Sequence, residues 1–553
     1  MSARNRLPIY AFLAALCLTS PGWAQVSSGP LGQVDPWGVG WLGKAEGALP
    51  STFWANTDAA TLGPILASLR PETLSPAATL ALRRVLLSSA KGPEDGAELI
   101  PERLRLIEQI GETGRSIDLR GRFPKAPWGR TADSLASELE LATGRSETAC
   151  ARVADRRADD PVWMPVRALC YAIAGDFNAA SMVGEQVVGA DGAASPWLVS
   201  ALETMREPTK TRPAGRYGSP FEVAVSVAAK LSVPANAFLS LPGDVALAVV
   251  RHEGATPDQK RAALPAAVET GKANPSDVLA VLGLPVNAPA SGKRAAPSSR
   301  IDYLALASAA AADENLKPDA RGTAFAVALK SGETRTDFRT ASLALHAALK
   351  ALPKSEATLA HSETFARASL VAGDQKLAGE WRALMDRAPD KSADPWAAAR
   401  IDLMLSFAGV GAGDASAILD RLLASVPATP AVAAKASTPA QRQADLRRIE
   451  NARALFLYVG LGRALTPEAR AVLAAQKTVG RGVSDAGLAR VRAANEAKAP
   501  GEAALAAIAL VGSDASAQSF AGLGDILTEL RRAGLETEAN AIALEALQVW
   551  KAL

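Results

Sequence analysis

Few residue patterns in this sequence have a spacing that could support chemistry. Residues 38–45 (GVGWLGKA) match the glycine spacing of a dinucleotide fingerprint and most of a phosphate-binding loop. A phosphate loop needs Ser or Thr after its lysine to hold magnesium, but Ala45 follows Lys44 here. No strand pattern precedes the segment. We therefore interpret it as a glycine-rich arm and predict no cofactor.

Candidate nucleophiles and metal ligands are equally scarce. Ser88 and Lys91 have the Ser-x-x-Lys spacing of penicillin-interacting enzymes, but the companion Ser-Asp-Asn and Lys-Thr-Gly motifs are absent. The histidines His252, His346 and His361 form no paired metal motif, although a hairpin could bring the last two together. The sequence predicts no catalytic residue, no metal site and no enzyme. An envelope enzyme with a site assembled from distant residues stays as an alternative.

The first residues have the layout of a secretory signal peptide. Arg4 and Arg6 form a positive region, residues 9–18 are apolar, and Gly22 and Ala24 place small residues at a cleavage site. We expect residues 1–24 to be removed by cleavage after Ala24, and the protein to be exported. The alternatives are an uncleaved membrane anchor and lipidation of Cys17. The residue usage resembles that of a GC-rich bacterium, so the expected compartment is the periplasm.

Composition narrows the fold class and the partners. Lys and Arg number 60 against 57 Asp and Glu, so the net charge of +3 gives no basic excess for nucleic-acid binding. Apolar residues make up 48% of the chain but aromatic residues only 5%, and alternating strand patterns are rare. Because Ala and Leu favour helices, the prediction is an all-α fold.

The segment 138–189 shows the expected architecture best. It reads as helix, glycine turn, helix, Asp-Asp-Pro break, helix, Gly-Asp turn and helix, with apolar residues at helical spacing. Cys150 and Cys170 lie almost symmetrically about Asp160, so antiparallel flanking helices would bring their sulfurs level. Export favours a disulfide between them. Two buried thiols remain the alternative.

Proline- and glycine-rich stretches divide the rest of the chain. Residues 25–50 are expected to form an extended arm whose tryptophans, with Trp54, pin it onto the first helices; a ligand platform is the alternative. Ser75 and Pro76 mark a helix start, after which Leu80, Val85 and Leu87 should face a core. Linkers are predicted at residues 207–220, 285–300 and 426–440, and residues 118–130 should be loop-like. The helical regions are then 51–206, 221–284, 301–425 and 441–553.

Four turns share one layout, in which a glycine ends a helix and an alanine follows five residues later. They are Gly144/Ala149, Gly175/Ala180, Gly373/Ala378 and Gly534/Ala539. This layout is similar to the inter-helix turn of tetratricopeptide (TPR) repeats, with Gly175-Asp176-Phe177 the best match. The resemblance implies an α-solenoid of stacked antiparallel hairpins, interrupted by the Pro/Ala-rich linkers.

A solenoid of this kind implies a binding function. Stacked hairpins form a long concave surface that suits protein or peptide partners. We therefore expect a periplasmic scaffold or adaptor associated with the cell envelope; a structural part of an envelope assembly is the alternative. Arg167, Tyr171 and Phe177 are the candidate partner-binding residues because they surround the best turn.

Overall fold

The computed structural model describes a large part of the chain. The described residues are 35–157, 159–187, 196–208, 212–234, 237–238, 242–283, 300–313, 315–332, 334–387, 394–410, 414–426, 438–476 and 482–551. The predicted signal peptide, most of the linker at 285–300 and most of the linker at 426–440 lie outside them. Residues Pro36–Leu553 form one compact unit.

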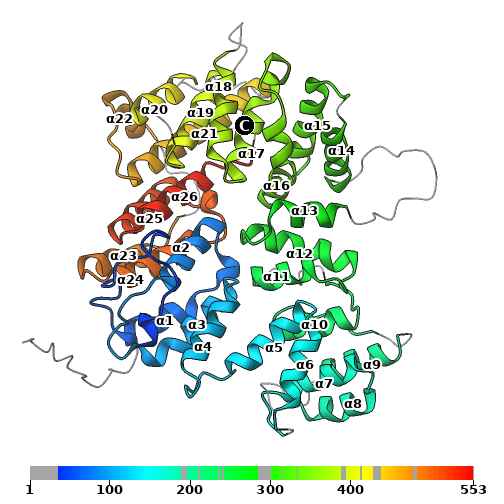
Figure 1. The fold of residues 1–553 in the computed structure, drawn as a ribbon. Coiled ribbons are helices and arrows are strands. Elements are labelled where there is room, and N and C mark those ends of the chain that lie inside the picture. The colour runs from blue at the N-terminus through cyan, green and yellow to red at the C-terminus, as the bar shows by residue number, and fades with distance from the viewer. Residues whose placement is uncertain are drawn as a thin grey trace, which may run out of the picture. The chain divides into compact units, whose positions relative to one another are not determined.

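The fold is all-α, as predicted. Within the described ranges the regular elements are helices, and β-pairing is limited to isolated bridges such as Leu42 with Ser88. Figure 1 shows the helices running from α1 to α26 along the chain. Among the described residues, no helix combines the length and apolar character needed to cross a membrane.

The first fifteen of these helices, α1 to α15, lie in the described part of the chain before α16. They are α1 (Ala59–Ser68), α2 (Pro76–Leu87), α3 (Ile100–Gln109), α4 (Thr113–Arg122), α5 (Ala132–Ala142), α6 (Ser146–Ala154), α7 (Met164–Ile173), α8 (Phe177–Gln186), α9 (Pro196–Arg206), α10 (Pro220–Ala228), α11 (Gly243–Arg251), α12 (Pro257–Glu269), α13 (Pro275–Leu282), α14 (Arg300–Ala312) and α15 (Pro318–Lys330).

The C-terminal half continues with α16 to α26 over its described residues. They are α16 (Arg335–Ala351), α17 (Ser362–Val371), α18 (Gln375–Met385), α19 (Pro395–Phe407), α20 (Ala415–Ala424), α21 (Pro439–Gly460), α22 (Pro467–Ala474), α23 (Asp485–Glu496), α24 (Pro500–Val511), α25 (Phe520–Arg532) and α26 (Glu536–Ala546). Short 3₁₀ helices include Pro36–Gly38 and Pro71–Thr73.

The four predicted turns have one geometry. Gly144, Gly175, Gly373 and Gly534 all have φ between +82° and +84°. A residue with a Cβ is strained in this left-handed conformation, which explains why glycine ends each preceding helix. The alanine five residues later has no exposed surface in any of the four turns, so each marks a close helix contact. At these turns α5 packs on α6, α7 on α8, α17 on α18 and α25 on α26.

The tryptophan-rich segment lies against the first helices, as expected. Trp37 is buried, donates to the carbonyl of Gly96 at 2.7 Å and stacks edge-on against Trp54 at 5.1 Å between ring centroids. Trp41 donates to Asp118 at 2.6 Å. A Cβ on Gly40 would lie 2.2 Å from the backbone nitrogen of Ser89. The glycines of this segment therefore permit close packing.

The structure corrects two sequence-based expectations. Residues 118–122 are helical rather than loop-like because α4 continues to Arg122, and Pro124 disfavours helix only at the residue before it. Leu80 does not face the core: 53% of it is exposed, because α2 buries the face formed by Ala78, Ala81, Leu82 and Val85. Val85 and Leu87 are buried, as predicted.

The described part of the first predicted linker is packed against its neighbours. Residues 212–219 are non-helical, but Gly215 donates to the carbonyl of Ser232 at 2.9 Å. The Ser226 hydroxyl accepts from the backbone nitrogen of Arg216 and donates to its carbonyl. Tyr217 is buried in the same region. This connection is therefore held in place by α10.

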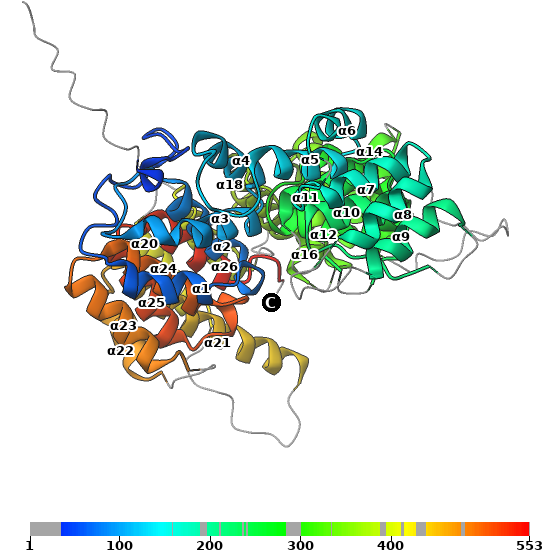
Figure 2. The same cartoon turned by 90° about the horizontal axis from the view of Figure 1, so that it is seen from below.

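The N-terminal helices pack directly on the C-terminal helices. Helix α2 contacts α24 and α26, and α1 contacts α24, as both views show (Figures 1 and 2). Ser75 donates its backbone N–H to the carbonyl of Gly512 at 2.7 Å, and Ala77 donates to Glu545 at 2.9 Å. Arg84 forms an ion pair with Glu538 at 2.7 Å. The first and last helices thus form one continuous core.

Candidate ligand-binding cavity

A cavity of about 880 Å³ lies where helices distant in sequence face one another. Its walls come mainly from α2, α12 and α16, together with the C-terminal end of α3 and the turn after α12. The volume falls within the range of ordinary ligand pockets. No short sequence motif spans these elements, so the sequence alone does not reveal this site.

Part of the cavity lining is apolar. Leu80 supplies an exposed side chain from α2, and Phe238 and three prolines, Pro71, Pro234 and Pro265, complete the wall. Leu80 is the residue that the helical pattern placed wrongly in the core. An exposed leucine in a cavity is an apolar surface available to a ligand.

The buried carboxylate of Glu112 contacts two cations that line the cavity. Glu112 accepts from Arg83 at 2.6 Å and from Lys272 at 2.7 Å, which joins α2 to the turn after α12. Burial tends to raise the pKa of Glu112, but these two hydrogen bonds and charges outweigh it and hold the pKa below its usual value. Arg83 and Lys272 therefore both contact this one carboxylate, which also lies 4.0 Å from Arg115.

A second group of charges lies at the start of α16. Arg335 forms ion pairs with Glu545 at 2.7 Å and with Glu269 at 3.3 Å, and lies over the ring of Trp550 at 5.7 Å. The Thr336 hydroxyl also donates to Glu269. Burial raises the pKa of Glu545 against the attraction of Arg335. Arg335 links α12, α16 and α26 and has its charge matched.

Arg339, one turn further along α16, differs from Arg335. It lines the cavity next to the turn at Gly271, where a Cβ would lie 3.5 Å from its Nη2 atom. The Nε atoms of both arginines are buried without a hydrogen-bond partner, but among the described residues only Arg335 has an ion pair. Burial, reinforced by repulsion from Arg335, lowers the pKa of the Arg339 guanidinium despite attraction from Glu269 and Glu545. The cavity thus contains a cation without a contacting counter-charge.

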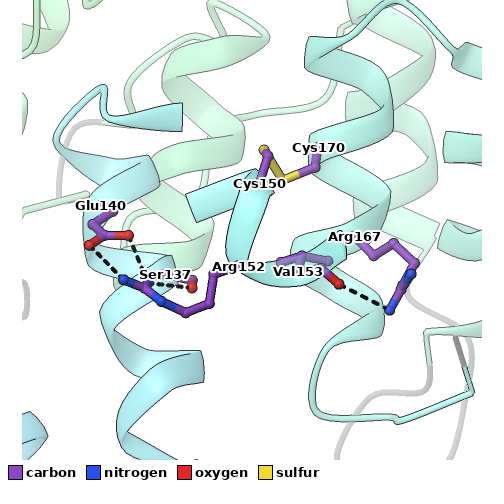
Figure 3. Close-up of a disulfide and its surroundings, with 7 residues drawn as sticks. All are labelled: Ser137, Glu140, Cys150, Arg152, Val153, Arg167 and Cys170. Carbon is purple, nitrogen blue, oxygen red and sulfur yellow. Dashed lines mark hydrogen bonds and ion pairs between the residues drawn. A yellow bond between two sulfur atoms is a disulfide. The ribbon is translucent and has the colours of Figure 1, made fainter. Parts of the chain in front are cut away.

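The structure brings the two cysteines together. The Sγ atoms of Cys150 and Cys170 lie 2.02 Å apart, at disulfide distance, and join α6 to α7 (Figure 3). Nearby, Arg152 donates to Ser137 and to both carboxylate oxygens of Glu140, at 2.8 to 3.1 Å. The predicted pairing of Cys150 with Cys170 is confirmed, because their sulfur atoms lie at disulfide distance.

The predicted partner-binding residues lie near this pair, away from the cavity lining. Arg167 is buried, and its guanidinium donates to carbonyls at the end of α6 and just beyond it, including Val153 at 3.4 Å (Figure 3) and Arg156 at 2.9 Å. Tyr171 and Phe177 are partly buried against the core. The described polar contacts of Arg167 thus close the turn between α6 and α7.

The remaining candidate residues are held by separate local contacts. His346 lies 3.1 Å from Asp374, and His361 lies 3.3 Å from the hydroxyl of Thr323, so the two histidines do not form a pair. Ser88 accepts from the backbone of Leu49 and donates to the carbonyl of Arg84. In the part of the chain that the structure describes, no three His, Cys, Asp or Glu side chains gather as metal ligands would.

Comparison of this chain with protein-family models, with functionally curated proteins and with solved structures finds no match.

Proposed function

We propose that this protein is an exported, TPR-like helical-repeat scaffold that binds protein or peptide partners in the cell envelope. The cavity between α2, α12 and α16 carries the proposal, because its lining combines apolar side chains with a guanidinium, that of Arg339, which contacts no carboxylate of the described residues. Four helical hairpins with the same glycine turn and buried alanine support the repeat character. Contacts between first and last helices would hold such a surface rigid.

Site-specific photo-crosslinking tests this proposal in the native host. Leu80→p-benzoylphenylalanine places the crosslinker in the cavity, and Asp258→p-benzoylphenylalanine, at an exposed position outside the cavity lining, is the matched control. Met182→p-benzoylphenylalanine, at an exposed residue of α8, samples the region of Tyr171 and Phe177.

The expected result is a set of polypeptide adducts formed from position 80 and not from position 258. Adducts from position 182 alone would move the binding surface to α7 and α8. Absence of polypeptide adducts at positions 80 and 182 would contradict a partner-binding function for either surface. Fractionation of the exported protein should place it in the periplasm, and its retention in the cytoplasm would contradict export.

A further inference from the structure

Three of the four cations that line the cavity contact a carboxylate of the described residues. Arg83 and Lys272 share Glu112, and Arg335 is held between Glu269 and Glu545. Arg339 remains as a half-buried guanidinium in the wall without a contacting carboxylate among the described residues. Partial burial of a charge costs free energy unless an opposite charge lies in contact with it. Contact with Arg339 would therefore increase the affinity of the cavity for an anionic ligand.

The carboxylates around Arg339 favour a singly charged ligand group over a doubly charged one. Glu269 and Glu545 lie close enough to act electrostatically on Arg339 and on anything bound to it. They would repel a doubly charged group such as a phosphate more strongly than a singly charged one. A planar guanidinium also matches a carboxylate through two parallel hydrogen bonds. The planar guanidinium of Arg339 thus fits one carboxylate.

The apolar residues of the lining indicate the chemistry of the rest of the ligand. Leu80, Phe238 and the prolines lie in the same cavity as Arg339, so the anion should be joined to an apolar group. The volume of about 880 Å³ has room for more than a single small acid. The terminal residue of a peptide combines a carboxylate and a side chain in this way.

We propose that the cavity binds the C-terminal carboxylate of a peptide chain at Arg339 and the apolar side chain of its last residue against Leu80. This inference rests on the proposed function and deepens it, because it names the part of the partner that is recognised. Arg335, Glu112 and Lys272 are positioning residues that hold the cavity walls.

Binding of defined probes by the full mature chain tests the inference. The probes are N-acetyl-Ala-Ala-Leu with a free carboxylate, the same peptide as its C-terminal amide, and octanoate, followed by isothermal titration calorimetry and ligand-observed NMR. The variants are Arg339→Gln and, as matched control, Arg321→Gln. Arg321 on α15 also has a buried Nε without a hydrogen-bond partner, but it does not line the cavity.

The free-acid peptide should bind at least tenfold more tightly than its amide. Arg339→Gln should abolish that difference, whereas Arg321→Gln should preserve it. Leu80→Ala should weaken the acid and the amide by the same factor. The melting temperature of Arg339→Gln should equal or exceed that of the wild type, because no described contact is lost; a lower melting temperature would indicate a structural role for Arg339.

Three results would overturn the inference. They are equal affinity for acid and amide, unchanged binding by Arg339→Gln, and binding of octanoate without binding of the peptide, which would assign the cavity to small organic acids. Polypeptide crosslinks at position 80 combined with equal acid and amide affinity would retain the proposed function and refute only the carboxylate assignment.

Discussion

At the scale of single residues, Glu112 shows how one buried carboxylate joins separate elements. It accepts from Arg83 and from Lys272, 160 positions away in the sequence. We expect Glu112→Gln to lower the free energy of unfolding at pH 7 by about 1–2 kcal/mol, since both cations are partly exposed and water screens them. Urea unfolding of the variant and the wild type measures this difference.

The same substitution predicts a pH dependence. The pKa of Glu112 in the folded protein lies below 4.5, the usual value for a glutamate. Its contribution to stability is therefore fully present above pH 4.5 and is lost as the pH falls through the folded pKa. The difference between wild type and Glu112→Gln should shrink between pH 5 and pH 3. Glu102→Gln, which breaks a more exposed pair with Arg105, should cost less than about 0.5 kcal/mol at either pH. A pH-independent difference would contradict this account.

At the scale of elements, the contact between α21 and α25 depends on two glycines. A Cβ on Gly460 would lie 2.5 Å from the carbonyl oxygen of Gly524 and 2.8 Å from its Cα. Because backbone atoms cannot move aside as a side chain can, Gly460→Ala should push the helices apart and cost about 1–3 kcal/mol. Chemical denaturation gives the change in stability.

Gly379 in α18 provides the matched control for Gly460. A Cβ there would meet no atom within 4 Å, and the residue is helical. Gly379→Ala should therefore raise the free energy of unfolding by about 0.5–1 kcal/mol through reduced backbone entropy of the unfolded chain. Shifts of the two variants in the same direction would refute the packing argument.

Cys150 and Cys170 are predicted to form a disulfide that links α6 to α7 and stabilises the fold. Peptide mapping of the exported protein without reduction should recover Cys150 linked to Cys170. The double variant Cys150→Ser, Cys170→Ser should lose up to about 3 kcal/mol, because a bridge across 20 positions restricts the unfolded chain. Free thiols at both positions, or unchanged stability of the variant, would contradict a structural disulfide.

At the scale of the whole molecule, α26 and the residues after it connect distant parts of the described chain. Glu545 accepts from Ala77 in α2 and pairs with Arg335 in α16. Arg400, whose pKa is lowered to about 10 by burial, donates to the carbonyls of Leu547 and Gln548, and Arg367 donates to that of Val549. Both guanidinium groups thus lie at the C-terminal end of α26, where positive charge stabilises the negative end of the helix dipole.

Removal of residues 536–553 should therefore loosen helices far from the deletion. Amide hydrogens of α2 should exchange faster in the truncated chain, because α2 loses its packing partner α26. Glu538→Gln breaks the Arg84 contact alone and should leave most of this protection unchanged. Full protection of α2 without α26 would show that the N-terminal helices form an independent unit.

The sequence by itself determined the helical class, the glycine turns and the cysteine pairing. Helical periodicity and left-handed glycines are local properties, since each depends on residues within one or two turns of helix. Spacing about Asp160 similarly placed Cys150 opposite Cys170. These features needed no knowledge of the rest of the chain.

Tertiary structure alone decided where the cavity lies and which charges are matched. Leu80 satisfies a helical pattern yet faces the cavity, because α2 buries its other face. Arg335 and Arg339 are both arginines on one helix, and only the positions of Glu269 and Glu545 give them different environments. Pairing of charges across hundreds of residues depends on how helices pack, and periodicity within each helix carries no information about its distant neighbours.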